Sequence, residues 1–209
     1  MVSTAPGAVR PAHRPSAREA MLDAVEAHLG AGGTLTLDSA ARAAEVSKPG
    51  LMYHFATKER LLTAVLDRIT ARYERGMVAA LDASVSGAAA GAVVIDDVIA
   101  DDVFAEASAV QRHLAYLDWA GEAQLSPADL VIFADPRLRA SLTERWQEQV
   151  DRWLHVPAGT PAGLRPRLLA VRLLADGLWF DRASGLLATS AAEAVSLRAL
   201  AAALLDGEA

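Results

Sequence analysis

The chain of 209 residues contains no cysteine. Disulfide bonds, thiolate metal ligands and a cysteine nucleophile are therefore excluded, and the composition is that expected of a protein from the reducing cytoplasm. Aromatic residues make up only 5% of the chain, whereas alanine, leucine and valine supply most of the 53% that is hydrophobic. Because alanine and leucine favour helices and aromatic residues favour strands, this balance predicts an all-α fold.

Long hydrophobic runs are absent too. The longest uncharged run, residues 83–95, is too short and too rich in glycine and serine to span a membrane, so we expect no membrane partner. Residues 1–15 contain three prolines and no apolar segment. We therefore expect a flexible tail there and no signal peptide.

Motifs of catalysis are also missing. No serine stands in a Gly-x-Ser-x-Gly turn, and no glycine-rich phosphate loop follows a strand pattern. The five histidines lie apart, without the spacing of metal ligands. The aspartates at 96, 97, 101 and 102 form an acidic group, which we interpret as a solvated helix face in preference to a cation site. We expect no enzyme activity, no metal and no cofactor.

The net charge of −6 argues against nucleic acid as a partner, but its distribution is uneven. Residues 1–75 contain ten basic and eight acidic side chains, whereas residues 76–209 contain ten basic and eighteen acidic ones. A solvated surface alone could produce this split. It nevertheless supports contact between the first part of the chain and an anionic partner.

The most specific pattern lies between residues 36 and 58. Ser47 can cap a short helix with Pro49 in its first turn, where the missing N–H of proline has no consequence. Thr36 can cap a second short helix just upstream, with Ala40 on its inner face. Two short helices joined by a tight turn form a helix-turn-helix, whose second helix enters the major groove of DNA.

Residues 36–62 resemble the DNA-binding signature of TetR-type transcriptional regulators. The resemblance rests on Thr36, the run from Ala43 to Lys48, Leu51, the triplet Tyr53-His54-Phe55, and Lys58-Glu59 with Leu61-Leu62. Two positions depart from the family pattern: Glu45 replaces the usual glycine of the turn, and Ala40 replaces the usual isoleucine. Residue 45 must therefore either adopt a left-handed conformation at some cost or reshape the turn.

The resemblance also implies a role for each residue of the motif. The residues expected to hold phosphates are Thr36, Ser47, Lys48, Tyr53 and Lys58. The residues expected to face the groove are Pro49, Gly50, Leu51 and His54.

Helix signals divide the chain into three parts. After the tail of residues 1–15, the resemblance implies a helix-turn-helix DNA-binding domain at residues 16–62 and a helical ligand-binding and dimerisation domain at residues 63–209. A long helix from Lys58 to about Leu81 is predicted to join the two domains. Ser16 and Ser190 begin capping boxes, and Asp135 can cap a helix with Pro136 at its first position. The chain is expected to contain about nine helices.

The last two predicted helices are apolar on more than one face, which indicates burial on two sides. In TetR-type regulators these helices pair with those of a second subunit as a four-helix bundle, whereas a large core within one chain is the alternative. The predicted interface consists of Leu169, Leu173, Leu174, Leu178, Val195, Leu197, Leu200 and Leu204.

A group of aromatic residues in the second domain suits a pocket for a small apolar or aromatic effector, although each residue taken alone is more often part of a core than of a ligand site. The candidate pocket residues are Trp119, Phe133, Trp146, Trp153, Trp179 and Phe180, with His113 and Tyr116 as polar members.

These features together predict a ligand-responsive DNA-binding regulator. The resemblance implies a homodimer, usually a repressor, that binds double-stranded operator DNA of palindromic sequence. The alternative is an all-helical protein-interaction adaptor without sequence-specific DNA binding, which Glu45 and the acidic second domain support.

Overall fold

The computed structural model describes residues 16–86, 103–186 and 188–207, and its regular secondary structure in these ranges is helical. No strand occurs in these ranges, which confirms the predicted all-α fold of about nine helices. The acidic group at residues 96–102 lies outside the described ranges. Within them, no helix has the length and apolar character needed to cross a membrane.

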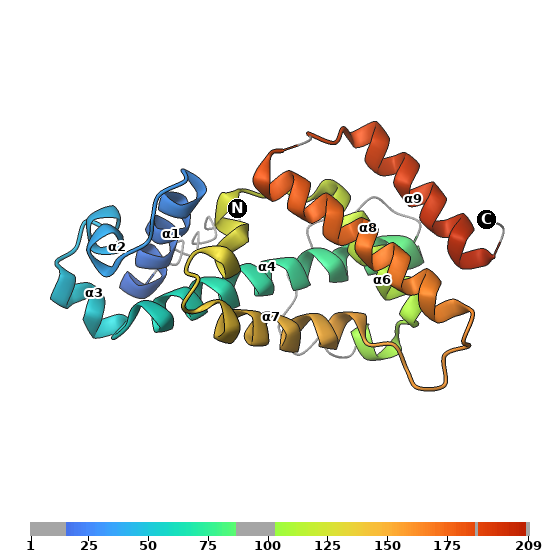
Figure 1. Cartoon of the computed structure of the whole chain (residues 1–209), viewed down its shortest axis with the longest axis horizontal. Coiled ribbons are helices and arrows are strands. Elements are labelled where there is room, and N and C mark those ends of the chain that lie inside the picture. Colours follow the sequence, from blue (N-terminus) through green and yellow to red (C-terminus); the bar gives the residue numbers. More distant parts are fainter. Residues whose placement is uncertain (1–15, 87–102, 187, 208–209) are drawn as a thin grey trace, which may run out of the picture.

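Three helices form one end of the molecule, here called the head (Figure 1). They are α1 (Ala17–Gly30), α2 (Leu37–Ala43) and α3 (Lys48–His54). The predicted cap of α1 is present, because the Ser16 hydroxyl accepts a hydrogen bond from the Glu19 N–H at 3.2 Å. The apolar stripe of α1, from Met21 to Leu29, is buried as predicted.

A single long helix, α4 (Lys58–Ser86), leads from the head along the rest of the molecule (Figure 1). It continues past Leu81, where the sequence predicted its end, and its 29 residues give a length of about 44 Å. Its predicted inner residues, among them Leu66, Ile69 and Met77, are fully buried. One rigid element therefore joins the core of the head to the core of the second domain.

Further helices form the body. They are α6 (Ala109–Glu122), the 3-10 helix η1 (Pro127–Phe133), α7 (Arg139–Leu154), α8 (Leu164–Ser184) and α9 (Ala191–Asp206). α6 packs against α4 and α8, and α9 covers α6 and α8 from outside (Figure 1). Two sequence signals at helix ends are confirmed: Gly185 ends α8 in a left-handed conformation with φ of 66°, and Ser190 forms a reciprocal capping box with Glu193.

The predicted helix start at Asp135 and Pro136 is wrong. α7 begins at Arg139, and its N-terminus has no side-chain cap. The Asp135 carboxylate instead accepts a hydrogen bond from the Arg137 N–H at 2.9 Å and another from the Lys58 ammonium at 2.6 Å. The Asp135 side chain, which the local sequence predicted to be a helix cap, is instead bound by Lys58 from a distant part of the chain.

Gly76 of α4 lies directly under Trp119 of α6. A Cβ atom at residue 76 would stand 2.3 Å from Cδ1 of Trp119. We expect Gly76→Ala to lower the free energy of unfolding by about 1–3 kcal/mol, because the indole must move although alanine favours helices. Urea denaturation measures this effect. Gly121→Ala is the matched control, since its Cβ would meet Ala194 at 3.4 Å, and equal stabilisation by both changes would contradict the close packing.

Candidate functional site

The α2–α3 pair has the caps that the sequence predicted. The Thr36 hydroxyl accepts a hydrogen bond from the Ser39 N–H, and the Ser39 hydroxyl accepts one from the Thr36 N–H, both at 2.9 Å. The Ser47 hydroxyl accepts a hydrogen bond from the Gly50 N–H at 3.2 Å. These bonds fix the start of each short helix, and thereby the angle of the turn between them.

Glu45 adopts the left-handed conformation, with φ of 55°. The turn therefore keeps its shape, and the backbone at residue 45 carries the strain of a side chain in this region. The Val46 N–H donates to the Ala41 carbonyl at 3.0 Å and closes the turn.

Replacing Glu45 with glycine is expected to raise the free energy of unfolding by up to about 1 kcal/mol, since glycine adopts positive φ without a Cβ clash. Thermal denaturation measures the change. Glu45→Ala is the control, because it removes the charge and keeps the strain. If alanine stabilises the protein as much as glycine does, the charge and not the backbone is responsible.

The outer side of α3 is largely exposed. Tyr53 is 86% exposed, and Pro49 and His54 are also exposed, while Gly50 is half-buried. Leu51 is fully buried beside the inward-facing Phe55, so its predicted position in the groove is wrong.

Met52, which the sequence analysis did not select, is 40% exposed on α3. It precedes Tyr53 and follows the buried Leu51, so the register of the helix could have identified it. α3 therefore presents Met52 and Tyr53 outward while Leu51 anchors it.

Both lysines of the motif are paired with carboxylates. Lys48 lies 2.9 Å from Asp38 of α2, and both side chains are well exposed. Lys58 lies 2.6 Å from Asp135, and its side chain is only 28% exposed. The hydrogen bond from Lys58, with that from the Arg137 N–H, holds the pKa of Asp135 below its usual value. Lys48 is thus available at the surface, whereas the phosphate role predicted for Lys58 requires it to leave Asp135.

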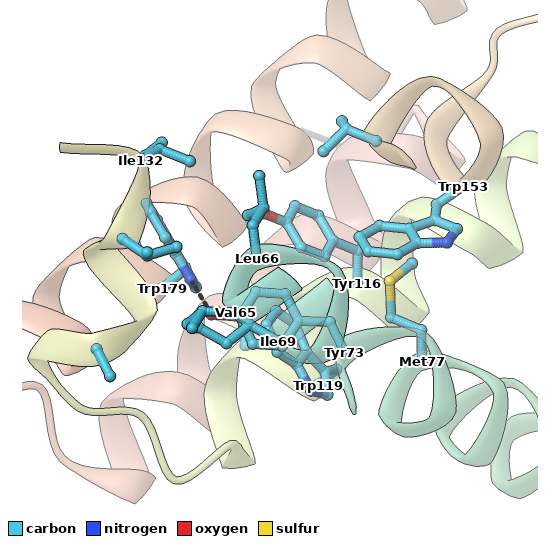
Figure 2. Packing of buried hydrophobic residues seen from close by; sticks show 14 of the residues in the cluster. Val65, Leu66, Ile69, Tyr73, Met77, Tyr116, Trp119, Ile132, Trp153 and Trp179 are labelled. Carbon is cyan, nitrogen blue, oxygen red and sulfur yellow. Dashed lines mark hydrogen bonds between the residues drawn. The ribbon is translucent and has the colours of Figure 1, made fainter. Parts of the chain in front are cut away.

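Most of the predicted pocket residues pack against each other around Tyr73 of α4. We call Tyr73, Trp119, Trp146 and Trp179 the aromatic cluster. The ring centroids of Trp119 and Trp146 lie 4.4 Å and 5.9 Å from that of Tyr73, and Trp146 lies 5.5 Å from Trp179. Figure 2 shows Trp119 beside Tyr73, and Trp179 hydrogen-bonded to the Tyr73 hydroxyl. The close spacing makes these rings part of the core.

Three further candidates extend this core. Tyr116 stacks on Trp119 at 5.8 Å and donates a hydrogen bond to Asp176 at 2.8 Å. Nδ1–H of the buried His113 donates to the Ala109 carbonyl at 2.7 Å, and burial lowers the pKa of His113. Trp153 has no exposed surface, and Figure 2 shows it near Met77.

Two predicted pocket residues are on the surface instead. Phe133 is 47% exposed and lies under the guanidinium group of Arg139, at 5.6 Å. Phe180 is 43% exposed on the outer side of α8. Their place in a pocket is a wrong prediction, because hydrophobicity alone does not distinguish a core position from an exposed one.

Cavities occur in the described part of the chain, but they are not lined by the predicted pocket residues. A groove of 290 Å³ between α4 and α7 is crossed by the ion pairs Asp67–Arg145 and Glu74–Arg152. A cavity of 320 Å³ lies between α6 and α9, beside the ion pair of Asp118 and Arg198. Neither has an aromatic residue in its wall.

The outer sides of α8 and α9 carry large exposed apolar residues. Exposure is 53% for Leu169, 60% for Leu173, 70% for Val195 and 54% for Leu200. These four residues and Phe180 are called the α8–α9 apolar face. Leu174, Leu197 and Leu204 are half-buried beside it. Leu178 is only 4% exposed and packs within its own chain, so its assignment to a subunit interface is wrong.

Among the residues that the structure covers, no group of three or more histidine, aspartate or glutamate side chains is arranged to hold a metal ion. The comparison of the chain with models of known protein families gives no match, and a search of the curated proteins gives none either.

Proposed function

We propose that this protein is a DNA-binding transcriptional regulator of the TetR type, acting as a repressor. The observation that carries the proposal is the helix-turn-helix of α2 and α3. Its second helix is anchored by Leu51 and Phe55 and presents Tyr53, which is 86% exposed. A large exposed aromatic side chain on a short, capped helix at one end of the molecule suits contact with a nucleic acid backbone.

Charge and exposure support the same function. The exposed start of α3 carries Lys48, and residues 1–75 have more basic than acidic side chains. Free N–H groups at a helix start and a nearby cation attract phosphate. The residues proposed to contact phosphates are Thr36, Ser47, Lys48 and Tyr53, with Lys58 joining them if it leaves Asp135.

A homodimer and an effector belong to this proposal. The α8–α9 apolar face gives a second copy of the chain a surface to cover, and groups of exposed apolar side chains mark interaction sites. Two heads would then bind a palindromic operator about one DNA turn apart, roughly 34–36 Å. An apolar or aromatic effector would act by entering or reshaping the aromatic cluster.

The adaptor function remains the second candidate, and one specific observation favours it. Both lysines of the motif are paired with carboxylates, Lys48 with Asp38 and Lys58 with Asp135. A DNA phosphate must displace these partners. An adaptor would use the exposed side of α3 to bind another protein.

The salt dependence of DNA binding tests the proposal. An operator is first selected from random duplex DNA, and its dissociation constant is then measured over a range of salt concentrations. We expect Lys48→Ala to weaken binding to all sequences alike and to reduce the slope of log K against log salt by about one unit, the loss of one phosphate contact.

Arg75→Ala is the matched control, because it removes one exposed positive charge from α4, outside the head. It should leave the slope unchanged. Unchanged affinity and slope in both Lys48→Ala and Tyr53→Phe would contradict the assignment of the DNA contacts. If no duplex binds in a salt-dependent manner, the adaptor function is the correct one.

A further inference from the structure

Asp129 of η1 is a buried carboxylate with four hydrogen bonds. Its side chain is 2% exposed. One oxygen accepts from the Tyr73 hydroxyl at 2.7 Å and from the Arg72 guanidinium at 2.9 Å. The other accepts from the Ser126 N–H at 2.7 Å and from the Ser126 hydroxyl at 3.2 Å. All four hydrogen bonds come from groups of the protein, so the buried charge is fully paired.

On one side, Asp129 is connected to the aromatic cluster. The Trp179 indole N–H donates to the Tyr73 hydroxyl at 3.0 Å, and the Tyr73 hydroxyl in turn donates a hydrogen bond to Asp129 (Figure 2 shows the contact of Trp179). Burial and the charge of Asp129 raise the pKa of Tyr73, so the hydroxyl stays protonated and keeps donating. A displacement of Trp179 therefore breaks a bond on the atom that binds Asp129.

On the other side, Asp129 is connected to the head. Arg72, which binds Asp129 with one nitrogen, binds Glu26 of α1 with another. Arg68, one turn earlier on α4, pairs with Asp23 and Glu26 of α1. η1 also packs directly on α1. Adjacent residues of α4 thus connect one carboxylate to α1 and to α8.

The hydrogen bonds of Asp129 cannot be weakened one at a time without a large cost in free energy. A buried charge that loses a partner is strongly destabilised, so the network is either complete or rearranged as a unit. A change in the aromatic cluster that removes the Tyr73 hydroxyl from Asp129 must be compensated by movement of η1 or Arg72. Both of these elements contact α1.

We propose that Asp129 is the positioning residue that fixes the head relative to the body, and that rearrangement of the aromatic cluster reaches the head through it. This inference rests on the proposed function, since it names how an effector in the body would change the spacing of the DNA-reading helices. Asp129 itself does not touch DNA or effector.

The absence of cysteine from the chain makes a direct distance measurement practical. Spin labels are attached to Met52→Cys on α3 and Gln147→Cys on α7, both exposed positions, and labelled chains are diluted with unlabelled protein. Pulsed electron–electron double resonance then gives the distribution of distances between the head label and the body label within one chain. Three variants interrupt the network: Tyr73→Phe, Glu26→Ala and Asp129→Asn.

We expect one narrow distribution in the parent protein and a second population of distances in each variant. Amide hydrogen exchange of α1 should become about tenfold faster, as expected from the loss of one charge-assisted hydrogen bond. Asp118→Ala is the matched control. It breaks the partly buried pair with Arg198 between α6 and α9, away from the head, and should change neither measurement.

If Glu26→Ala and Tyr73→Phe fold and still show the distance distribution and exchange rates of the parent protein, the proposal is overturned. Equal changes in Asp118→Ala would also overturn it. If Tyr73→Phe does not fold, as judged by circular dichroism, Glu26→Ala at the edge of the network decides alone. The measurements use the free protein. A chain that binds no DNA therefore still tests the positioning role, while the operator experiment tests the proposed function separately.

Discussion

Replacing Leu200 with glutamate is expected to produce a monomer that loses operator binding. Leu200 is 54% exposed within its chain, so the new carboxylate stays solvated in the monomer and α9 remains helical. In a dimer covering the α8–α9 apolar face, the same carboxylate would be buried without a partner. Loss of the second head removes the avidity of a two-site complex, which is roughly 10²–10⁴-fold in affinity.

Sedimentation and operator titration measure the two effects together. Leu173→Glu, on the neighbouring helix and 60% exposed, should behave in the same way. Phe133→Glu is the control, because Phe133 is 47% exposed outside this face and should leave the dimer intact. If both leucine variants still sediment as dimers, the subunits meet through another surface.

Replacing Trp153 with alanine is expected to have the largest effect on stability. Trp153 has no exposed surface, and removal of such a side chain leaves a cavity that costs about 3–5 kcal/mol. For a chain of this size the loss corresponds to a fall in Tm of roughly 10 °C. Trp153→Phe should cost less, because the indole N–H has no hydrogen-bond partner among the described residues.

Thermal and urea denaturation measure both variants against Phe133→Ala. Phe133 is 47% exposed and lies outside the α8–α9 apolar face, so its truncation should change the free energy of unfolding by less than about 1 kcal/mol. A Trp153→Ala protein of unchanged stability would mean that the indole lines a cavity, as a pocket residue would. The expected loss assigns it to the core.

Local signals predicted the helix ends of the head with few errors. The caps at Thr36 and Ser47 depend on hydroxyl groups and backbone N–H groups within three residues, so sequence spacing contains the whole interaction. The left-handed conformation of Glu45 is one of the two outcomes that the sequence left open for this turn. The error at Asp135 arose where a residue 77 positions away, Lys58, competes for the same carboxylate.

The candidate sites were predicted less completely, for a related reason. Helical spacing identifies an apolar stripe but not the element that covers it. Leu173 and Leu178 both belong to the predicted stripe of α8, yet the first is 60% and the second 4% exposed. Leu51 is similar, since the packing of α3 on the head turns it inward and leaves Met52 outside.

The sequence by itself determined the helical class, the helix-turn-helix with its caps, and the long helix that leaves it. These features follow from composition, short-range hydrogen bonds and a repeat of 3.6 residues. Only the tertiary structure decided which aromatic residues form the core and that Asp129 lies between head and body. Trp179 meets Tyr73 across 106 positions, and Tyr73 meets Asp129 across 56. Such contacts depend on how α4, η1 and α8 pack together, which no local pattern specifies.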